Sequence, residues 1–135
     1  AGDDAVHQAW SALDQSIREV EAAIDATMAQ QLLAIARMTR TAAEEYAIGV
    51  IDGRLDNAHE YQDAWGFVQV ARLRLDAMSG ADGEESRAIE RASTALAGLD
   101  RLWPGLAPEG GIDGDASLLH GAAARIELAA RSLPF

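Results

Sequence analysis

Residues 27–51 read TMAQQLLAIARMTRTAAEEYAIGVI, with apolar side chains at steps of three and four and no proline. Such spacing is typical of an α-helix that buries one face. The predicted face consists of Met28, Leu32, Ile35, Met38, Ala42 and Tyr46. Thr27 and Gln30 match a capping box, which predicts that the helix begins at Thr27. Gly53, inside a predicted turn over residues 52–57 (DGRLDN), ends it.

The same apolar rhythm extends upstream of Thr27, through Val6, Trp10, Leu13, Ile17, Val20 and Ile24. One unbroken helix from Asp4 to Ile51 would be about 70 Å long at 1.5 Å per residue. The later helical segments are less than half that length. A turn near Asp25–Thr27 gives the more compact domain and is therefore favoured, while a single long helix stays open as the alternative.

Three further amphipathic segments follow the turn. The first begins at Asp56 or Asn57 and has Tyr61, Trp65, Val68, Leu75 and Met78 on one side. The second carries Ile89, Ala92, Leu96, Leu99 and Trp103, and ends at Pro104-Gly105. After the longest loop, Pro104–Asp115, a last helix begins at Asp115 or Ser117. No segment alternates strictly between apolar and polar residues, so no strand is predicted.

These segments predict an all-α fold, an antiparallel helical bundle of four to five helices. The chain has 135 residues, which suits a single domain, 1–135, around one core. Alanine supplies much of its apolar content and favours helix over strand. The residues predicted to be mostly buried are Trp10, Ile17, Ile35, Tyr46, Trp65, Val68, Leu96, Leu99 and Ile126.

The chain is strongly acidic, with 22 acids, 11 bases and a formal net charge of −11. This balance argues against nucleic acid and anionic membrane surfaces as partners and is compatible with binding cations. There is no cysteine, which excludes disulfides and thiolate metal sites. The start at Ala1 fits either a mature end after removal of a leader or a trimmed chain, and both readings stay open.

Catalytic motifs are missing from the sequence. No serine lies in a Gly-x-Ser-x-Gly turn, and no glycine-rich loop carries the lysine that a phosphate-binding loop needs. The sequence therefore predicts a protein that is not an enzyme.

One group of residues has the chemistry of a metal site. His59, Glu60 and Asp63 open the helix after the turn, and His59 and Asp63 share a face at a spacing of four. Imidazole and carboxylates together suit iron, zinc or copper. Glu44 and Glu45 lie near the end of the preceding helix and face this group if the two helices pair antiparallel across the turn. The alternative is structural: Glu60 occupies the capping-box position after Asn57, and acids in a first turn complement the helix dipole.

The stretch Glu44–Ala71 resembles a known family. It holds an acid–tyrosine pair (Glu45-Tyr46), a Val-x-x-Gly turn (residues 50–53), a short link and a Glu-Tyr pair that opens a helix (Glu60-Tyr61). This order is similar to the extracytoplasmic N-terminal region of bacterial high-affinity iron permeases, the family of the oxidase-coupled fungal iron transporter. The Arg-Glu-x-x-Glu motifs of that family's membrane helices are missing from this sequence.

The resemblance implies a periplasmic or otherwise extracytoplasmic helical domain linked to uptake of iron or another divalent metal. Its expected partners are the metal ion and a membrane permease, or a membrane domain of its own, with a homodimer also open. Carried over residue by residue, Glu45, Glu60 and Asp63 fall on acids of the family pattern, and His59 is a candidate fourth ligand. Two other interpretations stay open: an extracytoplasmic ligand-binding sensor bundle of a receptor, and a structural interaction module.

Overall fold

The computed structural model describes residues 2–22 and 26–135, and side chains from residue 5 except those of 19–22. The upstream stretch forms two helices: α1 spans Gly2–Ala22 and α2 spans Met28–Gly49. The predicted capping box is confirmed. The backbone N–H of Gln30 donates to the Thr27 hydroxyl, and the backbone N–H of Thr27 donates to the side-chain oxygen of Gln30. Asp25, at the predicted turn, lies outside the described residues, as do the side chains of Val20 and Ile24.

The predicted turn after α2 contains a short hairpin, so the prediction of no strand is wrong in this detail. Strand β1 (Val50–Ile51) pairs antiparallel with β2 (Arg54–Leu55), and helix α2 ends at Gly49 rather than at Gly53. Asp52 and Gly53 both have positive φ, which is the geometry of a tight hairpin turn and suits an Asp-Gly pair. Two-residue strands are too short to show an alternating pattern.

The remaining elements follow the predicted order. Helix α3 spans Ala58–Asp76, α4 spans Gly83–Ala97, the 3-10 helix η1 spans Asp100–Leu102 and α5 spans Ala116–Arg131. The sequence left two candidates open for each cap, and the structure has Asn57 at the start of α3 and Asp115 at the start of α5. The fourth helix was expected to continue to Trp103, but it ends at Ala97, and the chain turns through η1 instead.

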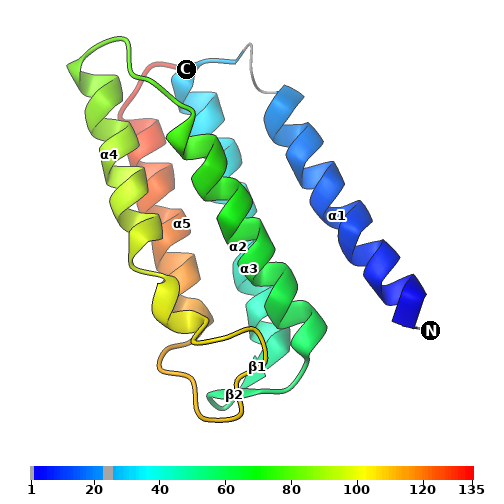
Figure 1. Cartoon of the computed structure of the whole chain (residues 1–135). Helices are drawn as coiled ribbons and strands as arrows, with labels where there is room; N and C mark the ends of the chain where they lie inside the picture. The colour runs from blue at the N-terminus through cyan, green and yellow to red at the C-terminus, as the bar shows by residue number, and fades with distance from the viewer. Residues whose placement is uncertain (1, 23–25) are drawn as a thin grey trace.

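Helices α2, α3, α4 and α5 form an up-and-down four-helix bundle (Figure 1). Helix α2 packs chiefly against α3 and α5, and α4 packs chiefly against α5. Helix α1 lies on the outside of this bundle, against α3 and α2. The hairpin and the loop after η1 lie together at one end, which we call the hairpin end (Figure 1). The all-α bundle predicted from sequence is confirmed.

The core lies between α2, α3, α4 and α5 and is rich in alanine. Of the residues predicted to be buried, Ile35, Tyr46, Val68, Leu96, Leu99 and Ile126 are buried. The prediction is wrong for Trp10, which is 66% exposed, and for Trp65, which is 39% exposed, while Ile17 is only half-buried. The reason is the position of α1: a helix outside a complete bundle covers its neighbour along one edge only.

Candidate functional site

The candidate site depends on a close approach of α2 and α3 at the hairpin end. A Cβ atom added at Gly49 would lie 2.6 Å from the backbone nitrogen of Tyr61, closer than such atoms can approach. The Gly49 carbonyl also accepts from the backbone N–H groups of Asp56 and Asn57, at 2.8 and 3.0 Å. Gly49 therefore allows the end of α2 and the start of α3 to come together, which brings the acids beside these positions close to one another.

A buried aromatic cluster holds the two helices at this distance. The rings of Tyr46 and Tyr61 lie 5.8 Å apart between centroids, and each contacts the ring of Trp103. Both tyrosine hydroxyls donate to the carbonyl of Leu102, at 2.9 and 3.2 Å, and Tyr61 also donates to Gly105 at 2.8 Å. Burial raises the pKa of both tyrosines, so they stay neutral hydrogen-bond donors.

Each of these tyrosines directly follows an acid, Glu45 or Glu60. Because the tyrosines fix the rotation of their helices, they also fix the direction in which the neighbouring acids project. This positioning role was not predicted from the sequence. The signal was present as the repeated acid–tyrosine pair, but the carbonyl partners lie more than forty residues away along the chain, at Leu102 and Gly105.

The structure brings together three of the four residues singled out from the sequence. Glu45 on α2 and Glu60 and Asp63 on α3 offer one carboxylate oxygen each, and these atoms all lie within 4.8 Å of one another. All three residues are half-buried. We call this group the carboxylate cluster. Carboxylate oxygens this close to one another can be shared by one metal ion.

His59, the fourth candidate, lies beside the cluster rather than in it. Its Nε2 atom is 4.0 Å from a carboxylate oxygen of Asp63, one turn along α3. Glu44, next to Glu45, is exposed and does not belong to the cluster.

The electrostatics of the carboxylate cluster favour a cation. Burial raises the pKa of Glu60 above its ordinary value, and the nearby charge of Asp63 raises it further. Burial also raises the pKa of Asp63, and the nearby His59 lowers that pKa by a smaller amount. Within the described part of the chain, no ion pair joins an arginine to any of the three acids. Their mutual repulsion is therefore left without a permanent positive neighbour.

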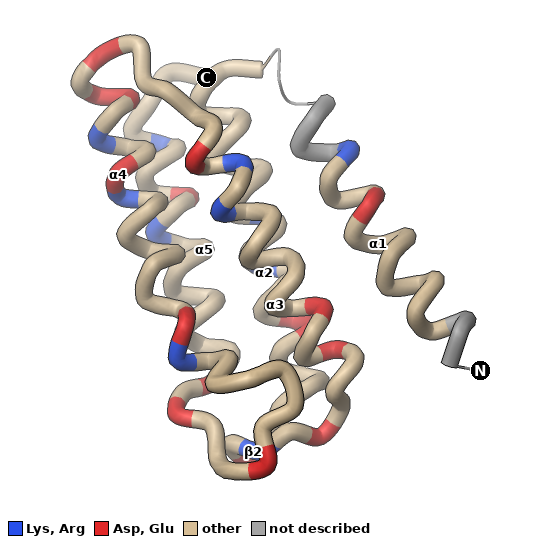
Figure 2. Tube along the Cα trace, viewed as in Figure 1, with Lys and Arg blue, Asp and Glu red and all other residues tan. Residues whose placement is uncertain are grey.

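The whole hairpin end carries the same sign of charge. Residues 44–63 and 100–115 hold ten acids and two arginines, which amounts to eight of the eleven net negative charges of the chain. Figure 2 shows acids around the hairpin and the adjacent loop. A surface with one sign of charge raises the local concentration of oppositely charged ions and speeds their arrival. The sign of this charge is therefore the one that attracts cations rather than anions.

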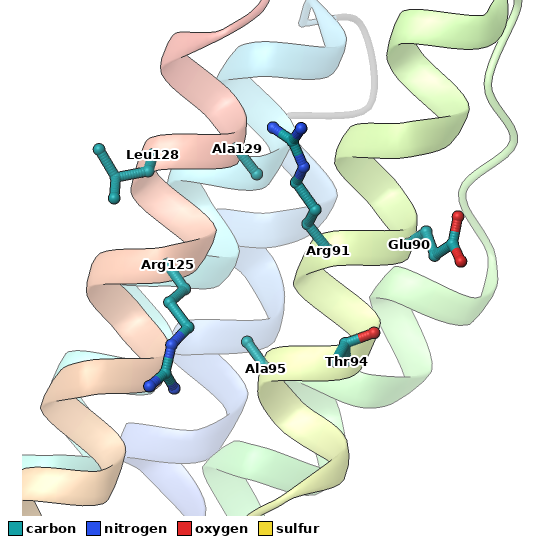
Figure 3. Close-up of a pocket in the computed structure, with 7 residues that line it drawn as sticks. All are labelled: Glu90, Arg91, Thr94, Ala95, Arg125, Leu128 and Ala129. Atoms are coloured by element: carbon teal, nitrogen blue, oxygen red, sulfur yellow. The ribbon is translucent and has the colours of Figure 1, made fainter.

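A groove between α4 and α5 is a second concave surface, with a volume of about 550 Å³. It has an apolar floor that includes Ala95 and Ala129, and it is flanked by Arg91 and Arg125. Figure 3 shows the two guanidinium groups pointing in opposite directions along the groove. They do not converge on one point, so this groove offers no single site for an anion.

Comparisons with known proteins give one result. Neither the curated proteins nor the solved structures yielded a significant match. A family model, described as the iron permease-associated 4-helix bundle domain, matches residues 21–133. The match covers α2 to α5, the hairpin and all residues of the carboxylate cluster.

The family match supports the resemblance drawn from residues 44–71 and extends it over most of the chain. Association with a permease is a role in transport rather than in catalysis. Among the helices that the structure describes, none combines the length and hydropathy needed to cross a bilayer. The chain belongs to the family of iron permease-associated four-helix bundle domains.

Proposed function

We propose that this domain binds a divalent metal ion, with iron as the physiological ion, through Glu45, Glu60 and Asp63. The observation that supports this most strongly is the convergence of three half-buried carboxylates from two helices, for which the described residues show no ion pair with an arginine. Carboxylates supply hard oxygen ligands, and His59 lies close enough to serve as an additional nitrogen ligand after a change of rotamer.

The family gives this site its context. A bundle associated with an iron permease is suited to hold iron on the extracytoplasmic side and to release it to the membrane pore. The acidic hairpin end then attracts the ion, and the cluster holds it. The family match favours this function over the receptor sensor and the structural module, since both of those lack a link to iron.

The test is a thermal melt of the protein with and without ferrous ion under anaerobic conditions, repeated with zinc and cupric ions. Any ligand that binds only the folded state raises the melting temperature by mass action. At a metal concentration 100 times the dissociation constant, the stabilisation is about 2.7 kcal/mol. We expect a clear upward shift in the parent and a much smaller one in Glu60→Gln, which keeps the shape of the side chain but removes its charge.

Glu44→Gln is the matched control, because Glu44 neighbours Glu45 but is exposed and does not belong to the cluster. This variant should keep the full metal-dependent shift. If the parent shows no shift at millimolar metal, the proposal is wrong. If Glu44→Gln loses as much as Glu60→Gln, the ion is held by the diffuse acidic surface and not by the cluster.

A further inference from the structure

Trp103 belongs to the aromatic cluster but comes from neither of the two helices that carry the acids. It directly follows η1 and is half-buried. Its ring lies edge-on to that of Tyr46, with 5.4 Å between the centroids and 84° between the planes, and its centroid is 6.3 Å from that of Tyr61. Trp103 therefore contacts both α2 and α3 at the end where Glu45 and Glu60 come together.

A hydrogen bond joins Trp103 to the backbone between two of the acids. Its indole N–H donates to the backbone carbonyl of Tyr61, with 3.1 Å between nitrogen and oxygen. Tyr61 stands between Glu60 and Asp63 near the start of α3, so this bond restrains the short stretch of backbone that carries both carboxylates. Because an indole has a single N–H donor and no acceptor, the bond also fixes the orientation of the ring.

The segment around Trp103 is held in return by the tyrosine hydroxyls. Tyr46 and Tyr61 both donate to the carbonyl of Leu102, which is fully buried, and Tyr61 also donates to that of Gly105. Residues 102–105 are thus joined to α2 and α3 by hydrogen bonds that run in both directions. The spacing of the two helices at this end depends on this segment as well as on the close approach at Gly49.

This restraint matters because the three acids repel one another while no ion is bound. Their carboxylate oxygens lie within 4.8 Å of one another, and repulsion between like charges at this distance favours separation of the two helix ends. Contacts that hold the acids together before an ion arrives lower the cost of assembling the site. A site that is preorganised in this way binds its ligand more tightly.

We infer that Trp103 is a positioning residue for the metal site: it binds no ion itself but holds Glu45, Glu60 and Asp63 in the arrangement that binds one. The inference rests on the proposed function and adds to it a residue outside the carboxylate cluster. Removing an outer contact that orients a metal ligand typically weakens metal binding about 10–100-fold. Trp103 acts through the backbone of Tyr61 rather than on a carboxylate directly, so the effect should be about tenfold.

Isothermal titration calorimetry with zinc ion alone, a probe without redox chemistry, measures the dissociation constant of the parent and of each variant. Trp103→Phe keeps an aromatic ring but removes the N–H donor, and it should raise the dissociation constant about tenfold. Trp103→Leu also removes the ring and should raise it further. Tyr61→Phe leaves Trp103 in place but removes the hydroxyl that bonds Leu102 and Gly105, so it should also weaken zinc binding. This second site keeps the inference testable if a Trp103 variant fails to fold.

Leu32→Ala is the matched control for stability. Leu32 is fully buried near the start of α2, at the other end of that helix from Glu45, so its truncation destabilises the fold without touching the cluster. Its zinc dissociation constant should stay within about twofold of that of the parent, because distant sites act independently. If Leu32→Ala weakens zinc binding as much as Trp103→Phe does, the effect is one of general stability and the inference is wrong.

The remaining outcomes separate this inference from the proposed function. A parent that binds no zinc overturns the proposed function and the inference with it. If the parent binds zinc and Glu60→Gln does not, but Trp103→Phe and Tyr61→Phe bind it as tightly as the parent, the proposed function stands and the positioning role of Trp103 is overturned.

Discussion

Helices α1 and α2 have similar apolar periodicity in the sequence but different positions in the structure. The predicted face of α2 is buried, with Leu32, Ile35 and Tyr46 almost fully removed from solvent. The predicted face of α1 stays partly exposed over its described side chains, with Trp10 at 66%. Periodicity identifies the apolar face of a helix, but the number of neighbours decides how far that face is buried. Helix α2 contacts both α3 and α5, whereas α1 lies outside the bundle.

The largest difference between the two helices should appear when one apolar side chain is truncated in each. Leu32→Ala should lower the free energy of unfolding by about 2–5 kcal/mol, because it removes buried methyl groups and leaves a cavity. Trp10→Ala should lower it by less than about 1 kcal/mol, since most of its ring is already in water. Urea denaturation at low protein concentration measures both. Equal losses would mean that α1 belongs to the core.

Two glycines allow the crowded α2–α3 contact at Gly49 to be compared with the open position at Gly66 on α3. Gly49→Ala should destabilise the protein by about 1–3 kcal/mol, because the new methyl group meets the backbone of Tyr61 and must push the helices apart. Gly66→Ala should instead stabilise it by up to about 1 kcal/mol, because the methyl group enters open space in the middle of a helix. Chemical denaturation of both variants tests the opposite signs.

The aromatic cluster should show a smaller effect. Tyr61→Phe leaves the Gly105 carbonyl without the Tyr61 hydroxyl and should cost about 1–2 kcal/mol in unfolding free energy. Tyr46→Phe should cost less, because the Leu102 carbonyl keeps the hydroxyl of Tyr61. Thermal denaturation of the two variants measures the order. The reverse order would contradict the account of how Tyr61 holds the loop.

The smallest expected effect is the pH dependence of the metal-free carboxylate cluster. The pKa of Glu60 is raised in the folded state, so the folded protein binds more protons than the unfolded chain, and the stability contributed by this group falls as pH rises through the folded pKa. Glu60→Gln should therefore raise the melting temperature at pH 7 by on the order of 1–3 °C. The gain should vanish near pH 4, where Glu60 itself is protonated. An equal gain at both pH values would exclude charge as the cause.

Much of the fold follows from local sequence signals. The caps at Thr27, Asn57 and Asp115 and the apolar face of α2 were all predictable, because they depend on residues within one or two helical turns. The juxtaposition of Glu45 with Glu60 was also predictable, since a short turn brings adjoining helix ends together.

The errors arise where distant parts of the chain decide the outcome. The exposure of Trp10 and Trp65 depends on where α1 docks, which its own sequence does not specify. The fourth helix ends at Ala97, before Leu102. The Leu102 carbonyl accepts hydrogen bonds from the hydroxyls of Tyr46 on α2 and Tyr61 on α3, so its partners come from two other helices. The hydrogen bonds that position the carboxylate cluster are likewise long-range, so the sequence predicted the acids but not the groups that hold them.

The central claim is that Glu45, Glu60 and Asp63 hold one metal ion jointly, and anomalous diffraction tests it most directly. Crystals soaked anaerobically with ferrous ion would be measured on both sides of the iron absorption edge. The account predicts one strong peak within coordination distance of a carboxylate oxygen from each of the three residues, and no such peak in Glu60→Gln. Iron found only at other acids of the hairpin end, or no ordered iron in the parent, would contradict it.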